Sequence, residues 1–136
     1  MIFVDTSFWV ALSLVDDSRR DDATRLLREH ANEGWTTTTL VRGETWTVLL
    51  RRRLTHRGAT SFLDRLDRSP RVTVLHVDEK LEEEALGWLR RHDERPYSHV
   101  DATSFAVMRS LGIGRALAFD GHFSAAGFVE LRATRA

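Results

Sequence analysis

The chain has 136 residues, of which 42% are hydrophobic and 29% are charged, as is usual for a globular protein of one domain. It contains no cysteine, which excludes disulfides, thiolate zinc sites and cysteine nucleophiles. Its 20 basic and 20 acidic residues give a net charge of zero, so a nucleic acid could be attracted only by a local basic patch.

Segments typical of strands and helices alternate along the chain. In the first half we expect strand 2–5, helix 7–14, helix 19–33, strand 35–39, helix 40–53 and helix 58–68. In the second half we expect strand 71–77, helix 78–92, loop 94–98, helix 99–112, strand 115–119, a short turn or helix at 121–127 and strand 128–131. This alternation predicts an α/β fold with a central, mainly parallel five-stranded sheet flanked by helices.

The sequence shows no internal repeat and no linker, so we expect one domain over residues 1–136, with a frayed tail at 132–136. Its N-terminus lacks the basic segment of a signal peptide, and Asp5 interrupts the apolar residues. No apolar run approaches the ~20 residues that a membrane-spanning helix needs. We therefore expect a soluble, cytoplasmic protein that has no membrane partner.

Four acidic residues map to one edge of the predicted sheet. Asp5 ends the first strand, and Asp120 follows the fourth. Glu44 lies one turn into the helix after the second strand, and Asp101 lies in the first turn of the helix at 99–112. In open parallel sheets, ligands bind beyond the carboxyl ends of the strands, where these residues are expected.

A cluster of carboxylates needs a physical explanation because like charges repel. Two unit charges ~4 Å apart cost about 4 kcal/mol at an effective dielectric constant near 20. Such a cluster persists if some acids stay protonated or if a cation lies among them. Ligands that are all oxygen suit Mg²⁺ or Mn²⁺. The sequence therefore predicts a divalent metal site at this edge.

Each acid also has a purely structural interpretation. Asp5 could cap the helix that follows it, and Asp101 could form a capping box with Ser98. Asp120 could belong to a turn with the glycine after it. Glu44 could form a surface ion pair with neighbouring arginines. The functional interpretation is favoured because all four acids fall at the same edge of the sheet.

The sequence resembles the PIN domain and, within it, the VapC-type toxin ribonucleases of toxin–antitoxin pairs. The resemblance covers nearly the whole chain. The matching stretches are VDTSFWVAL at 4–12, VRGETWTVL at 41–49, SHVDATSFAVMRSLG at 98–112 and ALAFDGHFSAAGF at 116–128. The resemblance implies that metal binding and catalysis are performed by Asp5, Glu44, Asp101 and Asp120.

The resemblance further implies a metal-dependent endoribonuclease that uses Mg²⁺ or Mn²⁺ and leaves 5′-phosphate and 3′-hydroxyl ends. The implied partners are an RNA substrate, a cognate antitoxin in a heteromeric complex, and a second copy of the chain in a homodimer. Thr6 or Ser7 matches a hydroxyl often placed beside the site, and Ser98 could support it. Family members often carry a second hydroxyl residue shortly before the last acid, where this chain has Ala118 and Phe119.

Substrate phosphates must approach an acidic pocket, so nearby arginines should help to bind them. The candidates nearest in sequence are Arg42, Arg109 and Arg115.

Two other functions remain possible at this stage. The first is a PIN-like regulatory module that binds RNA or an antitoxin without cutting. The second is a receiver-type signalling domain, in which Asp78 would be the acid at the end of the third strand. A receiver also needs a lysine near its last strand, but the only lysine of this chain is Lys80.

Overall fold

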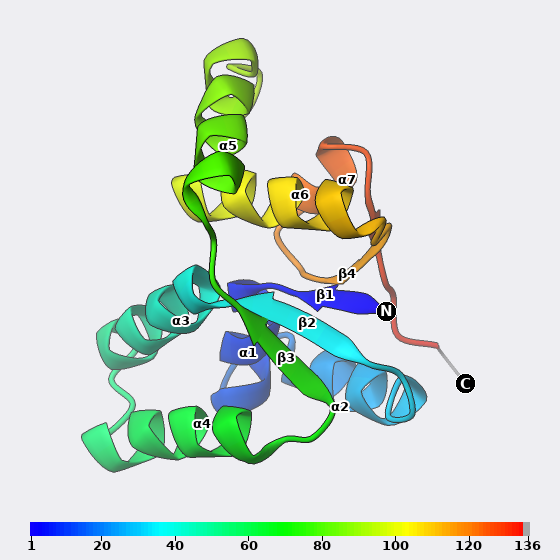
Figure 1. Ribbon diagram of the computed structural model, residues 1–136. Coiled ribbons are helices and arrows are strands. Elements are labelled where there is room, and N and C mark those ends of the chain that lie inside the picture. Colours follow the sequence, from blue (N-terminus) through cyan, green and yellow to red (C-terminus); the bar gives the residue numbers. More distant parts are fainter. Residues whose placement is uncertain (135–136) are drawn as a thin grey trace.

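A five-stranded sheet forms the centre of the computed structural model, which describes residues 1–134 (Figure 1). The strands are β1 (Ile2–Val4), β2 (Trp35–Thr38), β3 (Val72–Leu75), β4 (Arg115–Leu117) and β5 (Val129–Glu130). They lie in the order β3-β2-β1-β4-β5, and all neighbouring strands are parallel. The predicted α/β fold and its five strands are confirmed, and the sheet is parallel throughout.

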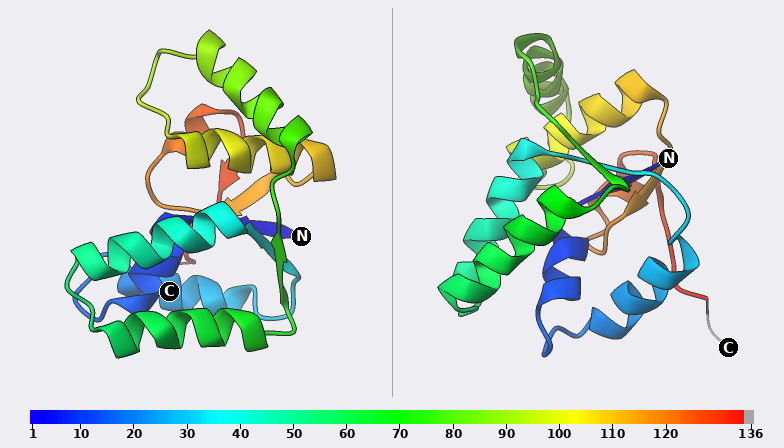
Figure 2. Two further views of the ribbon diagram at one scale, coloured as in Figure 1. Left: turned by 60° about the vertical axis from the view of Figure 1, so that its left-hand side comes forward. Right: turned by 60° about the horizontal axis from the view of Figure 1, so that its bottom comes forward.

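Helices cover both faces of the sheet (Figures 1 and 2). They are α1 (Thr6–Ser13), α2 (Arg20–Glu29), α3 (Thr39–Arg51), α4 (His56–Arg68), α5 (Glu79–Arg91), α6 (His99–Leu111) and α7 (His122–Ala125). Helices α5 and α6 lie on one side, and α1, α2 and α4 lie on the other. None of the helices within residues 1–134 is long and apolar enough to cross a membrane.

The strand order separates this fold from the receiver domain. Receiver domains share the flavodoxin-like order 2-1-3-4-5, in which the third strand lies inside the sheet. Here β3 is an edge strand, and Asp78 caps α5 by accepting a hydrogen bond from the Leu81 N–H (2.9 Å). The receiver hypothesis is therefore wrong.

The core is apolar on both faces of the sheet because helices cover both. Ile2, Phe3 and Val4 are completely buried, as expected for a central parallel strand. The ring of Phe123 lies 6.1 Å from that of Phe3 and 4.9 Å from that of Phe105. These contacts tie α6 and α7 to β1 and fix the region where β1 and β4 end.

Several element boundaries differ from the prediction by a few residues. The second helix ends at Glu29 rather than at residue 33, because His30 leaves the helical conformation and a turn follows. The fourth helix begins two residues early because the Thr55 hydroxyl caps it, accepting from the Gly58 N–H (3.1 Å). Strand β4 ends at Leu117, so Asp120 lies in the loop beyond the strand.

The C-terminal segment is attached more firmly than the expected frayed tail. Ala133 packs against the core, and the Thr134 N–H donates a hydrogen bond to Glu29 (2.9 Å). Residues 132–134 therefore contact the domain, and residues 135–136 lie outside the described part of the chain.

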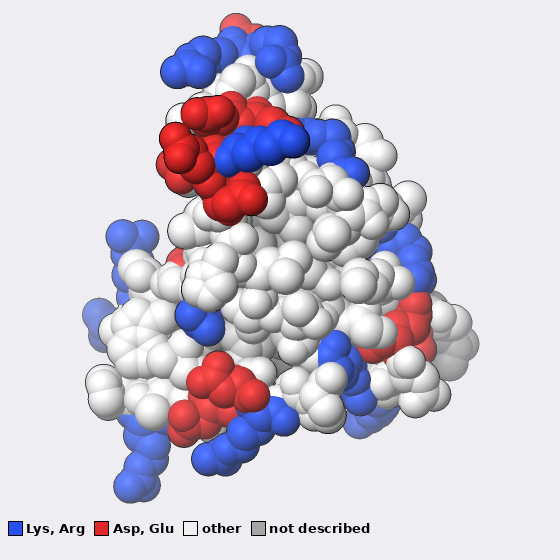
Figure 3. Space-filling view, viewed as in Figure 1, with Lys and Arg blue, Asp and Glu red and all other residues white. Residues whose placement is uncertain are grey.

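Charged side chains form separate groups on the face shown in Figure 3. Acidic groups gather over the first turns of α5, which contain Glu79 and Glu82, and basic groups over its far end, which contains Arg90 and Arg91. This order suits the helix dipole. No uniform basic surface covers this face.

The C-terminus of α6 offers a stability test. Gly112 has a positive φ of 68°, which an alanine would adopt only with strain. Gly112→Ala should therefore lower the free energy of unfolding by about 1 kcal/mol, measured by urea denaturation. Gly114→Ala is the matched control, since its surroundings are equally open and its φ is not positive. Equal losses in both variants would contradict this account.

Candidate active site

The candidate site lies where the strand order reverses. Strands β1 and β4 are neighbours, but the chain continues from β1 toward β2 on one side and from β4 toward β5 on the other. The crevice beyond the carboxyl ends of such strands is the usual ligand site of open α/β sheets. Asp5 follows β1 directly, and Asp120 lies three residues beyond β4.

Asp5 is both the N-cap of α1 and the most buried acid of the site. Its Oδ2 accepts hydrogen bonds from the Ser7 N–H (3.1 Å) and from the Ser7 hydroxyl (2.7 Å). The residue is only 2% exposed. The pKa of Asp5 is raised from 3.8 to about 7, mainly by burial. The negative charges of Asp120 and Asp101 contribute to this increase, and the hydrogen bonds from Ser7 oppose it. A carboxylate here is stable only beside a compensating positive charge.

Asp101 is held at the third position of α6 by a capping box. The Ser98 hydroxyl accepts from the Asp101 N–H (2.9 Å), and Asp101 Oδ2 accepts from the Ser98 N–H (2.9 Å). Asp101 is 6% exposed. Within the described residues the capping box engages Oδ2, so the other oxygen of Asp101 can still contribute to a cation site.

Glu44 approaches the other acids from α3. The Thr38 hydroxyl caps the start of this helix by accepting a hydrogen bond from the Val41 N–H (3.1 Å). Burial raises the pKa of Glu44, Thr6 partly offsets this, and the charges of Asp101 and Asp120 add to the increase. The Thr6 hydroxyl is buried and makes no hydrogen bond of normal geometry within residues 1–134. It is therefore available to a ligand or a water molecule in the site.

Asp120 is positioned by the turn that precedes α7. Its Oδ1 accepts from the His122 N–H (3.0 Å), and Gly121 has the positive φ of 81° that the turn requires. Burial raises the pKa of Asp120, and Asp101 and Glu130 add to this, while the His122 N–H lowers it. The structural interpretations of Asp5, Asp101 and Asp120 as cap and turn residues are thus correct, and they place these acids in one electrostatic cluster.

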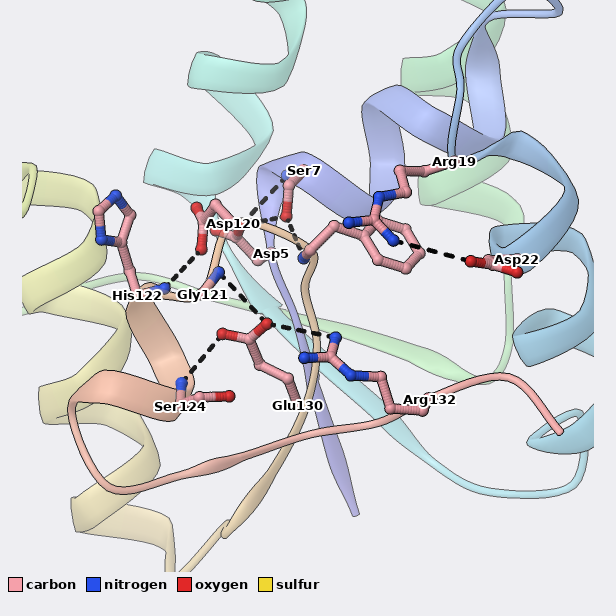
Figure 4. A network of polar contacts seen from close by, with 11 residues as sticks. Asp5, Ser7, Arg19, Asp22, Asp120, Gly121, His122, Ser124, Glu130 and Arg132 are labelled. Carbon is pink, nitrogen blue, oxygen red and sulfur yellow. Dashed lines mark hydrogen bonds and ion pairs between the residues drawn. The ribbon is translucent and has the colours of Figure 1, made fainter.

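Ser7 links Asp5 to the loop that carries Asp120. Its Oγ accepts a hydrogen bond from the Phe119 N–H (2.9 Å) while donating to Asp5 (2.7 Å). The serine therefore connects the end of β1 to the loop after β4. Figure 4 shows Ser7 in contact with Asp5, with Asp120 close by.

Glu130 supports the loop of Asp120, a role that the sequence analysis missed. Its side chain is 1% exposed and accepts from the N–H groups of Gly121 (3.3 Å) and Ser124 (2.9 Å), as Figure 4 shows. Arg132 lies 3.8 Å from the same carboxylate. A glutamate within the apolar segment FVEL was the available signal, because a buried charge in a short strand needs partners.

A surface cavity of about 350 Å³ opens beside the acids. Its lining includes three of the four acids, the first two residues of α1, which both carry hydroxyls, and two arginines that the sequence analysis did not select. These residues are Asp5, Thr6, Ser7, Arg19, Glu44, Arg52 and Asp120.

The three arginines selected from the sequence lie elsewhere. Arg42 points toward α4 and approaches Asp67 at 4.0 Å. Arg109 lies beside α5, eight residues or about 12 Å along α6 from the aspartate at its start. Arg115 begins β4 and pairs with Glu33, so it lies at the opposite end of the strand from the acids. None of the three lines the cavity, so proximity in sequence was a poor guide.

The donor set fits a hard divalent cation, because all candidate ligands are oxygens and the carboxylates repel one another. Within residues 1–134, however, no three His, Asp or Glu side chains converge into a closed metal cluster. Asp5, Asp101 and Asp120 would hold the ion, and Glu44 lies close enough to share their electrostatic cluster. The buried, unsatisfied hydroxyl of Thr6 is consistent with such a ligand.

The raised pKa of Asp5 predicts how stability depends on pH without metal. The folded state binds the proton of Asp5 more tightly than the unfolded chain does. The contribution of this proton to the stability of the folded state is therefore complete below pH 3.8 and is lost as pH rises through about 7. At pH 8 in EDTA, Asp5→Asn should therefore have a larger free energy of unfolding than wild type, by on the order of 2 kcal/mol. Its melting temperature should be correspondingly higher. The difference should shrink at pH 4. A pH-independent difference would contradict this, and Asp64→Asn, on the exposed face of α4, is the control.

The same repulsion predicts a response to metal. Mn²⁺ should raise the melting temperature of wild type more at pH 8 than at pH 5, because protons compete with the ion. Asp101→Asn should abolish most of this response. An unchanged response would remove Asp101 from the site.

Glu130→Gln should disturb the loop of Asp120, since an amide group replaces one accepting oxygen opposite a backbone N–H. We expect a loss of about 1–3 kcal/mol in the free energy of unfolding, measured by urea denaturation. Glu79→Gln, in the first turn of α5, is the control. If Glu130→Gln is as stable as this control, the carboxylate does not anchor the loop.

Comparisons with known proteins agree with this geometry. The model of the family described as PIN domain matches residues 2–129. Proteins named 23S rRNA-specific endonuclease VapC20, from two strains of Mycobacterium tuberculosis, are 55% identical over 132 residues, 97% of this chain and 98% of theirs. The crystal structure of M. tuberculosis VapC20, titled a Sarcin-Ricin loop cleaving toxin, superposes with a TM-score of 0.90 over 97% of this chain and 99% of that one. This chain belongs to the PIN-domain family, among its VapC-type toxin ribonucleases.

Proposed function

We propose that this endoribonuclease acts on the ribosomal RNA of the large subunit, within the sarcin–ricin loop, and depends on Mg²⁺ or Mn²⁺. The observation that carries the metal dependence is the electrostatic cluster at the strand switch, where burial and two acidic neighbours raise the pKa of Asp5 to about 7. The choice of RNA is supported by the names of the relatives, which are 55% identical over nearly the whole chain.

The residues of the chain have separable roles in this proposal. Asp5 and Asp101, the two most buried acids of the site, hold the ion, and Ser7 keeps Asp5 in place. Asp120 completes the ligand set from the loop after β4. When bound, the ion would lower the pKa of a water molecule and neutralise charge on the phosphate.

Glu44 is suited to orient the attacking water. It is only partly buried and lies beside the Thr6 hydroxyl, which lowers its pKa in part. Its raised pKa makes it a better proton acceptor than an ordinary glutamate. In-line attack of the water would leave 5′-phosphate and 3′-hydroxyl ends.

We further propose that the toxin works in the cytoplasm and is silenced by a cognate antitoxin that covers the cavity. A homodimer is also part of the proposal. Size-exclusion chromatography with light scattering would test the dimer, and affinity purification of the chain from its native cells would test whether an antitoxin copurifies with it.

The decisive experiment is cleavage of intact ribosomes and total RNA by the purified chain, free of antitoxin. With Mg²⁺ or Mn²⁺ we expect one major cut in the large-subunit RNA, mapped by primer extension to the sarcin–ricin loop. EDTA, Asp5→Asn and Asp101→Asn should each reduce the rate at least a hundredfold.

The other outcomes discriminate the alternatives. Cleavage at another RNA would retain the nuclease and change the substrate. Cleavage that persists in EDTA would contradict the metal dependence. A stable protein that binds metal and RNA but cuts neither ribosomes nor total RNA would favour the non-cutting regulatory module.

A further inference from the structure

Two arginines of the cavity have no role in the proposal above. Arg19 precedes α2 and Arg52 follows α3, and both line the cavity together with Asp5, Glu44 and Asp120. Their side chains are 51% and 43% exposed, so a ligand can reach them. We propose that Arg19 and Arg52 form a phosphate-binding pair that holds the RNA at a phosphate next to the one that is cleaved. This inference rests on the proposed function.

Asp17 holds both arginines at one end of the cavity. Its Oδ2 accepts from the Arg52 guanidinium (3.1 Å), and its Oδ1 accepts from the backbone N–H of Arg19 (2.8 Å). The Asp17 side chain is only 12% exposed, so it provides a firm anchor. The Arg19 guanidinium lies 3.8 Å from Asp22. A guanidinium has five N–H donors, so one ion pair leaves donors that can bind a phosphate in a bidentate manner.

The position of Arg19 is linked to that of the acids. Its guanidinium carbon lies 5.5 Å from the centre of the Phe119 ring, a cation–π contact. Phe119 immediately precedes Asp120, its N–H donates to Ser7, and its ring lies 6.0 Å from that of Phe8. The ring therefore cannot move away freely. Figure 4 shows Arg19 on the far side of Ser7 from Asp120.

Arg52 is linked to the acids through α3. Glu44, Val48 and Arg52 are spaced four residues apart, and all three line the cavity, so one face of the helix runs along it. From Glu44 to Arg52 the helix rises about 12 Å. The cavity thus has an acidic end and an arginine end. A second RNA phosphate would be repelled by the carboxylates at the acidic end and attracted by Arg19 and Arg52 at the arginine end.

RNA binding without cleavage provides the direct test. The probe is a fluorescent RNA hairpin that contains the sarcin–ricin loop, titrated with the full chain carrying Asp101→Asn so that it is not cut. Adding Arg19→Gln or Arg52→Gln should raise the Kd about tenfold or more. Each should also reduce the slope of log Kd against log salt concentration by about 0.7 to 0.9, as expected for one lost phosphate contact.

Arg25→Gln is the matched control, because Arg25 is an exposed arginine of α2 that does not line the cavity. Its Kd and salt slope should stay at the values of the parent. The inference is overturned if Arg19→Gln and Arg52→Gln have the same Kd and salt slope as Arg25→Gln.

A neutral phosphate in the RNA tests the same contact with the arginines intact. Single methylphosphonate linkages would be placed at the positions flanking the cleaved bond. One of them should weaken binding of the parent about tenfold and cause no further loss in Arg19→Gln or Arg52→Gln, because the contact is already gone. Additive losses at every position would overturn the inference.

Cleavage by the chain with Asp101 intact separates the two proposals. If wild type cuts the hairpin and the arginine variants do so with unchanged KM and salt dependence, the inference fails and the proposed function stands. If binding depends on the arginines but wild type cuts no RNA, the phosphate pair stands and the proposed function fails.

Discussion

Repulsion among buried carboxylates is the constraint on which the rest of this structure depends. Asp5 lies in the core at the end of a completely buried strand, where its charge is unfavourable and is opposed by Asp120 and Asp101. An apolar residue there would avoid the burial of a charge but would leave the start of α1 without its cap. The surrounding hydrogen bonds hold the acids in place despite this cost, so the folded chain keeps a strong affinity for positive charge at one point.

The local devices that hold the acids are ordinary features of helix and turn formation. A helix cap fixes Asp5, a capping box fixes Asp101, and a glycine turn fixes Asp120. Structural and functional interpretations of these residues were therefore not true alternatives. Each cap satisfies the backbone of a helix start, and parallel strands bring the helix starts to one edge. Capping thus becomes the means by which the fold positions its chemistry.

The sequence sufficed for the fold and for the place of the four acids at one edge of the sheet, because both depend on local patterns; their role in metal binding stays a prediction. Short apolar runs identified the strands, and Asp5 and Asp120 follow such runs directly. The arginines could not be found in this way. Arg115 is close to Asp120 in sequence but lies at the other end of β4, whereas Arg52 is distant in sequence and is carried along α3 to the cavity. The spacing of Glu44, Val48 and Arg52 was a usable signal, but Arg19 depends on a loop whose path no periodicity predicts. Glu130 was missed because its partners are backbone N–H groups of another segment.

The hydroxyl of Ser7 has a mechanical consequence. It is shared between the carboxylate of Asp5 and the backbone of Phe119, so it extends the link between β1 and β4 beyond the backbone hydrogen bond from the Asp5 N–H to the Leu117 carbonyl (3.0 Å). A displacement of either loop is transmitted to the other through two short hydrogen bonds. The position of Asp5 therefore depends on the loop that carries Asp120, and we expect a partner that displaces this loop to disturb both acids.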